Sequence, residues 1–112
     1  MCRSDSLNII TDSISELAKT SFGTALDSVV LYGSYARGDQ NEESDIDIMV
    51  LADVPAHELT AYKKEFVKLT SALGLEYDVV ITVTLKDSAT FNRYYSVMPF
   101  YQNVLKEGIK IA

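Results

Sequence analysis

Apolar residues along this chain follow two alternating periods, that of a helix and that of a strand. From Leu7 to Leu17 they recur at steps of three and four, which predicts one face of an amphipathic helix, at Leu7, Ile10, Ile14 and Leu17. Ser28 to Tyr32 is a short β-branched and aromatic run that ends at Gly33. It predicts a buried strand, because it is too short for a helix.

The middle of the chain carries a second strand pattern and then a long helix pattern. Asp45 to Leu51 begins with a period of two, so one face of the predicted strand carries Asp45, Asp47, Met49 and Leu51. After the turn signals Asp53 and Pro55, an amphipathic helix is predicted from about Ala56 to Leu73, closed by Gly74. Its apolar positions are Leu59, Tyr62, Phe66, Leu69 and Leu73.

The last third of the chain begins with a pronounced strand pattern. Tyr77 to Leu85 is rich in Val, Ile, Thr and Tyr and predicts a third strand. Asp87 or Ser88 can then cap a short turn of helix. A final helix is predicted over Val97 to Lys106, stopped by Gly108, and Ile109 to Ile111 can add a short edge strand.

Helices that alternate with strands indicate the α/β (α+β) class, with a small mixed β-sheet and helices packed mainly on one face. The chain has 112 residues, of which 47% are hydrophobic and 23% charged. This length and composition are typical of one folded domain, and we find no repeat or linker within residues 1–112. One domain is therefore expected, with a core small enough for an exposed apolar face to accept a partner.

Charge and hydropathy narrow the function classes. Ten Lys and Arg against 16 Asp and Glu give a net charge of −6, which argues against strong nucleic-acid binding, because phosphate-backbone affinity comes mainly from basic side chains. No apolar run approaches the roughly 18 residues of a membrane span, and the N-terminus lacks the hydrophobic region of a signal peptide. We therefore expect a cytoplasmic protein that does not enter the membrane.

Candidate chemistry gathers around the second predicted strand. Asp45 and Asp47 are two positions apart, and such residues point to one face of a strand about 6.6 Å apart at the backbone. Their carboxylates can converge on one cation or bracket two, as in two-metal phosphoryl or nucleotidyl transfer. Oxygen ligands favour Mg²⁺, with Mn²⁺ as an alternative.

A third carboxylate, that of Asp78, falls near the start of the predicted third strand, which is otherwise apolar. Burying an unpaired charge is costly, so a metal ion or another cation is expected beside it. If the second and third strands are neighbours, Asp78 completes a triad of metal ligands, and it can act as general base on an acceptor hydroxyl.

Gly33, Ser34 and Arg37 lie directly after the first predicted strand. Gly33 lets the backbone approach a phosphate closely, and the free N–H groups of a helical turn that opens at Ser34 would face an anion. Arg37, on the same side of that turn, can neutralise an oxygen of a triphosphate. These three residues are the predicted nucleotide-binding group.

In these residues the chain resembles the minimal nucleotidyltransferases of the DNA polymerase beta superfamily. Gly33-Ser34, Arg37-Gly38 and Ser44-Asp45-Ile46-Asp47 are similar to the family's first motif, and Asp78 is similar to its third carboxylate. The resemblance extends over essentially the whole chain, including a suggestive closing helix from Tyr101 to Ile109. The motif from Gly-Ser to Asp-x-Asp is the specific part.

The resemblance implies Mg²⁺-dependent transfer of a nucleoside monophosphate, with ATP as the favoured donor, to a hydroxyl. It also implies pairing with a HEPN-domain toxin, in which the chain acts as antitoxin by adenylylating a toxin tyrosine. A homo-oligomer is an equal alternative for the partner. For the activity, the alternatives are a non-catalytic antitoxin that neutralises its partner by contact, and transfer to a small-molecule hydroxyl. The residues leave the acceptor, the base preference and the role of Tyr94 and Tyr95 open.

Overall fold

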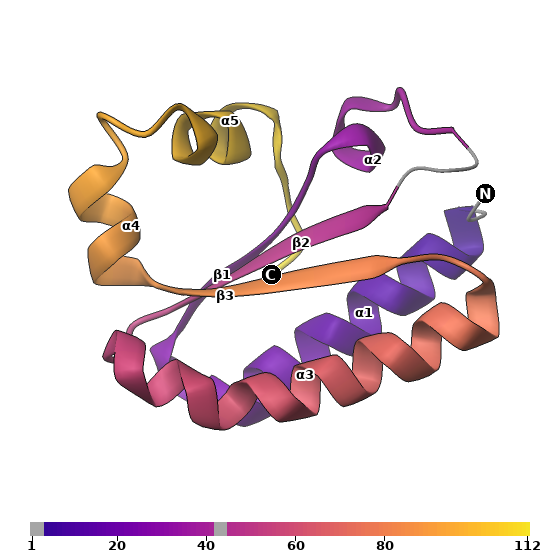
Figure 1. Ribbon diagram of the computed structural model, residues 1–112, viewed down its shortest axis with the longest axis horizontal. Helices are drawn as coiled ribbons and strands as arrows, with labels where there is room; N and C mark the ends of the chain where they lie inside the picture. Colours follow the sequence, from indigo (N-terminus) through magenta and orange to yellow (C-terminus); the bar gives the residue numbers. More distant parts are fainter. Residues whose placement is uncertain (1–3, 42–44) are drawn as a thin grey trace.

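The computed structural model describes residues 4–41 and 45–112. These residues form a mixed sheet between two layers of helices (Figure 1). The strands are β1 (Leu26–Tyr32), β2 (Ile46–Ala52), β3 (Ile81–Asp87) and β4 (Ile109–Lys110). The helices are α1 (Ser4–Phe22), the short 3-10 helix η1 (Gly23–Ala25), α2 (Ser34–Arg37), α3 (Ala56–Tyr77), α4 (Ser88–Tyr94) and α5 (Pro99–Glu107).

The sheet has the strand order β3-β2-β1-β4. β1 is antiparallel to both β2 and β4, whereas β2 and β3 are parallel. The chain returns from β2 to β3 through the long helix α3, as a parallel pair requires. The predicted α+β class with a small mixed sheet is confirmed, and the second and third strands are neighbours, which was the condition set for Asp78 to join the other two carboxylates.

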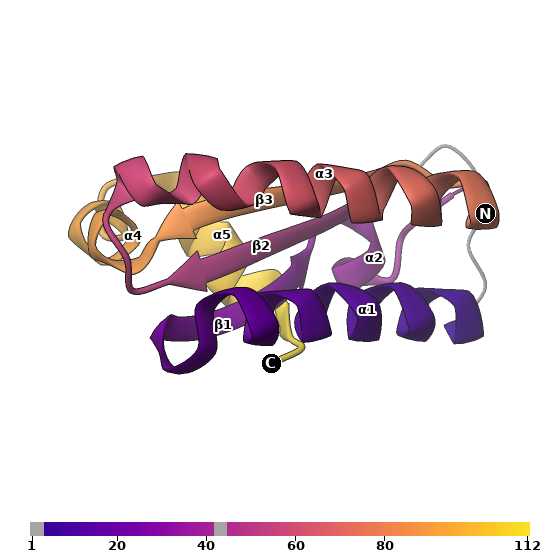
Figure 2. The same cartoon turned by 90° about the horizontal axis from the view of Figure 1, so that it is seen from below.

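The two long helices, α1 and α3, cover one face of the sheet (Figure 2). Their spacing accounts for this: the buried positions recur every four or seven residues, which places them on one side of each helix. They are Ile10, Ile14 and Ala18 in α1, and Leu59, Phe66 and Leu73 in α3. These side chains pack against Val29, Leu31, Ile46, Ile48, Val50 and Ala52 of the sheet. This is the larger of the two cores.

The opposite face of the sheet carries the short helices α2, α4 and α5 (Figure 1). A smaller core lies there, made by Val30, Met49, Leu51, Phe91, Tyr101 and Val104. Because strand side chains alternate between faces, Met49 and Leu51 share this side with Asp47. The predicted face of Asp47, Met49 and Leu51 is thus confirmed, and it faces the short helices.

The boundary between α3 and β3 differs from the sequence prediction. The helix was expected to close at Gly74 and the strand to begin at Tyr77, but α3 continues to Tyr77 and β3 starts at Ile81. Leu73 and Tyr77 both pack against the larger core. Because they are four residues apart, an additional helical turn places Tyr77 on the same buried side as Leu73. Gly74 lies inside the helix, where a Cβ would come within 2.7 Å of the Val79 carbonyl oxygen. Its role is therefore to let the chain pass closely.

The last helices lie close to where they were expected. Asp87 is the predicted cap of α4: its Oδ2 accepts a hydrogen bond from the Thr90 N–H at 2.9 Å. Burial raises the pKa of Asp87, but hydrogen bonds from Thr90 outweigh it and hold the pKa below its usual value. The final helix begins two residues later than predicted, because Pro99 occupies its first turn.

No helix within residues 4–41 and 45–112 is both long enough and apolar enough to cross a bilayer. Tyr94, the last residue of α4, and Tyr95, which follows it, are about 40% exposed (41% and 40%). The Tyr95 ring lies 6.2 Å from that of Phe91, between ring centroids, so Tyr95 partly covers the smaller core.

Candidate functional site

The site begins at the sharp turn between β1 and α2. Gly33 has φ 76° and ψ −156°, a backbone conformation that is essentially restricted to glycine. Its carbonyl accepts hydrogen bonds from the Ala36 and Arg37 N–H groups, both at 3.1 Å, and α2 ends at Gly38 in the left-handed region. Ser34 therefore opens a helical turn directly after a strand, as the sequence predicted.

Asp47 lies against this turn. It pairs with Tyr32 in the β1–β2 register, so both side chains stand on the face that carries α2. A Cβ on Gly33 would lie 2.6 Å from Asp47 Oδ2. The absence of a side chain at position 33 is thus what lets the carboxylate and the turn come together.

The surroundings of Asp47 disfavour the charged form of its carboxyl group. Burial raises the pKa of its carboxyl, the nearby Asp45 carboxylate raises it further, and the Arg37 guanidinium lowers it. Asp45 is exposed and directly precedes β2. The structure therefore brings together Gly33, Ser34, Arg37, Asp45 and Asp47, five of the six residues that the sequence singled out. Ser44, quoted with the same motif, lies outside the described residues.

Asp78 is the exception. It was expected on the third strand beside Asp47, but it is the exposed residue that ends α3, in the left-handed conformation with φ 53°. The β3 residue in register with Asp47 is Thr82. That placement on a strand was wrong, because the hydrophobic spacing of α3 extends to Tyr77 and delays the strand. The assignment of Asp78 as a third ligand stays a prediction.

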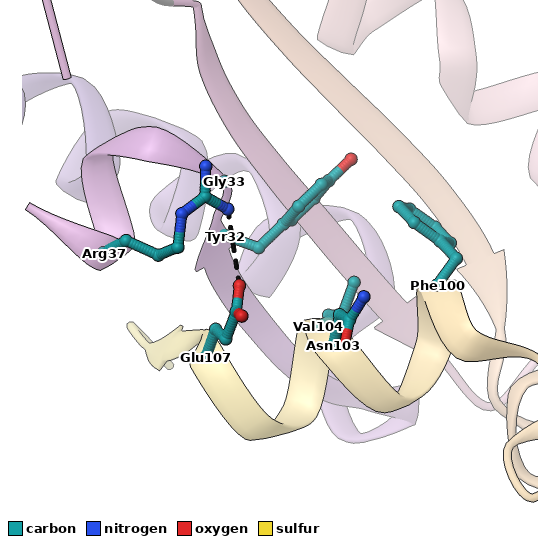
Figure 3. Close-up of a pocket in the computed structure, with 7 residues that line it drawn as sticks. All are labelled: Tyr32, Gly33, Arg37, Phe100, Asn103, Val104 and Glu107. Carbon is teal, nitrogen blue, oxygen red and sulfur yellow. Dashed lines mark hydrogen bonds and ion pairs between the residues drawn. The ribbon is translucent and has the colours of Figure 1, made fainter. Parts of the chain in front are cut away.

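Arg37 is engaged by two carboxylates. Its Nε lies 3.2 Å from Asp39 Oδ2 and its Nη1 lies 3.3 Å from Glu107 Oε2, the second contact being drawn in Figure 3. The hydrogen bonds that Arg37 donates to Asp39 and then to Glu107 raise the pKa of Arg37. The guanidinium stays exposed, so both ion pairs are weak enough to exchange for a phosphate.

A pocket of about 170 Å³ lies beside Arg37, between the end of β1 and helix α5. Figure 3 shows its lining, which is Tyr32, Gly33, Arg37, Phe100, Asn103, Val104 and Glu107. The α5 members were missed as site residues. Their spacing of three, four and seven positions marks one helix face, but nothing in the sequence says that this face meets the end of β1.

Tyr32 joins the pocket to the carboxylates. Its ring meets that of Phe100 edge-on, with centroids 5.6 Å apart. Burial raises the pKa of Tyr32, the neighbouring Thr84 side chain lowers it, and the Asp47 charge adds to the rise. The phenol therefore stays neutral at physiological pH and serves as a wall of the pocket.

The described side chains fit a divalent cation in one respect. Asp47 is half-buried beside a like charge, and a cation would relieve that repulsion. Two carboxylates completed by phosphate oxygens and water are a usual Mg²⁺ site. Within residues 4–41 and 45–112, however, no group of three acidic, His or Cys side chains is close enough to hold an ion. Asp45 and Asp47 are therefore the two candidate cation ligands among the described residues.

Comparison with known families and curated proteins gives consistent matches. The family model described as nucleotidyltransferase domain matches residues 11–111. A Methanocaldococcus jannaschii protein, provisionally named a protein adenylyltransferase, is 37% identical over 90 residues, which cover 80% of this chain and 82% of the relative. A second protein of that organism with the same provisional name is 43% identical over 58 residues, or 51% of this chain and 56% of the relative.

Two solved structures share the fold. A crystal structure described as a toxin-antitoxin with AMP-PNP has a TM-score of 0.57 and 25% identity, covering 91% of this chain and 72% of that chain. The Shewanella oneidensis complex of a tri-AMPylated HEPN toxin with an MNT antitoxin has a TM-score of 0.52. Its 21% identity, over 94% of this chain and 71% of that chain, speaks for the fold alone.

Proposed function

The chain belongs to the nucleotidyltransferase domain family, and on that premise we propose that it is a protein adenylyltransferase, acting as the antitoxin of a HEPN-domain toxin. It transfers AMP from ATP to a tyrosine hydroxyl of that partner. The observation that carries the proposal is the contact of the Asp47 carboxylate with Gly33 at the start of α2, within the electrostatic reach of Asp45 and Arg37. The provisional names of the relatives and the toxin-antitoxin neighbours support the choice of acceptor.

In this proposal each residue has one task. The turn at Gly33 and Ser34 receives the triphosphate, and Arg37 exchanges its ion pairs with Asp39 and Glu107 for phosphate oxygens. Asp45 and Asp47 would hold Mg²⁺, which neutralises charge on the phosphates when bound. The described carboxylates suffice for one ion; a second ion would need Asp78 to join them.

The transfer itself is a substitution at the α-phosphorus. The acceptor hydroxyl oxygen forms a bond to that phosphorus, and the bond to the bridging oxygen of the β-phosphate breaks. Pyrophosphate leaves with the electron pair, and the hydroxyl proton passes to a base. Asp47 is half-buried, so it can orient the reacting groups while an acceptor from another molecule can still approach.

Labelling tests the proposal. The protein is incubated with Mg²⁺, ATP labelled in its α-phosphate and the protein encoded beside it, and we expect label on that neighbour. The double variant Asp45→Asn with Asp47→Asn should abolish labelling, whereas Asp53→Asn, an exposed aspartate beyond the other end of β2, should retain it. Full labelling by the double variant would contradict the site, and no labelling by the wild type would contradict the activity.

Asp78 is tested separately by Asp78→Asn. Asparagine adopts the left-handed conformation as readily as aspartate, so this change preserves the end of α3 and removes only the charge. A third metal ligand or general base would lose transfer as Asp47→Asn does. Unchanged transfer would limit Asp78 to its place at the helix end.

The position of Asp78 also favours a second candidate, an antitoxin that acts by contact alone. Asp78 ends α3, and no three acidic side chains within residues 4–41 and 45–112 form a group that could hold an ion, so the described site is incomplete for two-metal chemistry. Calorimetric titration with ATP and Mg²⁺ distinguishes the two candidates. A catalytic protein binds the nucleotide, whereas a contact-only antitoxin neutralises its partner with no detectable nucleotide binding up to millimolar concentration.

A further inference from the structure

The outer edge of β3 has no strand beside it among the described residues. β3 ends the strand order and is seven residues long, whereas the opposite edge is the two-residue strand β4. The β2–β3 ladder runs without interruption from the pair Ile46 and Ile81 to the pair Ala52 and Asp87. A regular, extended edge of this length is a template for another strand.

The hydrogen-bond pattern shows which groups this edge presents. Ile46 pairs with Ile81, and its N–H donates to the Val80 carbonyl at 2.9 Å. In a parallel ladder this places the backbone groups of the even-numbered β3 residues toward β2. The N–H and C=O groups of Ile81, Val83 and Leu85 therefore point outward, where an added strand would satisfy them.

The same edge borders an open groove of mixed character. A cavity of about 310 Å³ lies between α3 and β3, lined by the apolar residues Phe66, Val67, Ile81, Val83 and Leu85 and by the polar residues Lys63, Thr70, Ser71 and Thr82. The three apolar strand residues are only partly buried, and Val67 is 56% exposed. Proline, bulges and inward charges usually protect such an edge. Over residues 81–86 of β3 the only charged residue is Lys86, near the end of the strand, and the next residue, Asp87, caps α4.

We propose that this edge pairs with a second copy of the same chain, β3 antiparallel to β3 about a two-fold axis at Val83. The sequence Ile-Thr-Val-Thr-Leu over 81–85 is self-complementary in that register. Val83 meets Val83 of the second copy, Ile81 meets Leu85, and Thr82 meets Thr84. Apolar and β-branched pairs thus fall on the α3 side and threonine pairs on the other, both of which stabilise antiparallel sheets.

Charge favours the same arrangement. Antiparallel pairing places Lys86 of one copy opposite Val80 of the other, next to the exposed Asp78. Each two-fold interface thereby gains two contacts between opposite charges at its ends. No like charges face one another along residues 80–86.

The helices beneath the strands would join the interface. Because Val67 borders the same groove as Val83, the two-fold axis brings Val67 of both copies together under the continuous sheet. The joined sheet would have eight strands, with the partly buried Ile81, Val83 and Leu85 of both copies enclosed. The surface holding Asp45 and Asp47 lies on the opposite side of the sheet from α3 and stays open.

The oligomeric state of purified protein without nucleotide tests this inference independently of enzymatic activity. Sedimentation velocity should show a concentration-dependent dimer. Val67→Glu places two carboxylates at the axis and should weaken the dimer at least about tenfold. Ile9→Glu is the matched control, since Ile9 is an exposed apolar residue of α1 (47%), and it should leave the dimer intact.

Val83→Pro tests the strand pairing itself. Proline removes an outward N–H that the monomer's ladder does not use, so the variant should keep its circular dichroism spectrum and lose the dimer. A wild-type protein that stays monomeric at high-micromolar concentration would overturn the inference. So would a dimer that survives both Val67→Glu and Val83→Pro, or one that Ile9→Glu weakens equally. A monomer in which Val83→Pro abolishes binding to the co-expressed neighbour would overturn it too, and would assign the edge to a strand of that protein.

Discussion

Gly33 meets two requirements that no other residue type meets together. Its backbone lies at φ 76° and ψ −156°, and its Cα faces the Asp47 carboxylate. The sequence suggested that a glycine here would admit a phosphate. The structure adds that the missing side chain also leaves room for Asp47 of the neighbouring strand. Gly33 therefore lets the turn at the start of α2 contact a proposed metal ligand.

Substitution of Gly33 should therefore destabilise the protein by more than backbone strain alone would. We expect Gly33→Ala to lower the free energy of unfolding by about 2–4 kcal/mol and to reduce transfer at least about a hundredfold, because the new methyl group displaces Asp47. Gly38→Ala is the control: Gly38 has a similar φ of 78° but nothing within 4 Å of its would-be Cβ. It should cost about 1–2 kcal/mol. Urea denaturation measures both, and equal costs would contradict the clash.

Arg37 shows what residue types alone leave out. Its position three residues after Ser34 suggested a phosphate ligand, whereas its contacts are Asp39 and Glu107. Glu107 lies 70 positions along the chain. A pairing at that separation depends on how α5 packs across the sheet, which local spacing does not report.

The junction of α3 and β3 is the element whose limits decide the site. Gly74 was interpreted as a helix terminator, yet it lies within α3, and both Asp78 and Val79 donate N–H groups to its carbonyl. The close passage of Val79 fixes where the chain leaves the helix. It therefore also fixes which residue of β3 stands beside Asp47.

This close passage predicts an unusual sign for a helix substitution. Glycine to alanine inside a helix normally stabilises by about 1 kcal/mol, but at position 74 the new Cβ would lie 2.7 Å from the Val79 carbonyl oxygen. We expect Gly74→Ala to destabilise by about 1–3 kcal/mol. Thr60→Ala, at an exposed position of the same helix, should stabilise by a few tenths of a kcal/mol. Chemical denaturation compares the two, and a gain in stability at position 74 would disprove the tight contact.

The two helical layers of the molecule are unequal. α1 and α3 bury a large core on one face, and the core on the other face has six buried residues, of which three come from α4 and α5. Seven of the exposed large hydrophobic residues fall within 94–109, namely Tyr94, Tyr95, Val97, Met98, Phe100, Leu105 and Ile109. The layer beside the pocket next to Arg37 is therefore the less stabilised part of the molecule.

Hydrogen exchange should report this difference. We expect backbone amides of α4 and α5 to exchange at least about tenfold faster than those of β1, β2 and the centre of α3, because local opening there exposes less apolar surface. Mass spectrometry of deuterated peptides measures it. Uniform protection across both layers would contradict the prediction, whereas slower exchange of α5 with ATP and Mg²⁺ present would place the nucleotide beside it.

Much of the fold follows from local pattern. The two long helices lie where the apolar spacing predicted them, because one apolar face determines both the helix and the side that is buried. The spacing is that of Leu7, Ile10 and Ile14 in α1, and of Leu59, Phe66 and Leu73 in α3. The group from Gly33 to Asp47 is also readable, since its members lie within 15 positions of one another on consecutive elements. The strand placement of Asp78 was wrong because it depended on where α3 ends and β3 begins.

The sequence by itself determined the class of fold, the family and the turn that carries Gly33, Ser34 and Arg37, since these depend on periodicity and on residue types that are close along the chain. Tertiary structure alone decided that Asp47 packs on Gly33, that Glu107 pairs with Arg37 and that Thr82, instead of Asp78, stands beside Asp47. The physical reason is that strand register and helix length are fixed by how side chains distant in the sequence are buried in a common core. A local stretch of sequence does not show which of them will meet there.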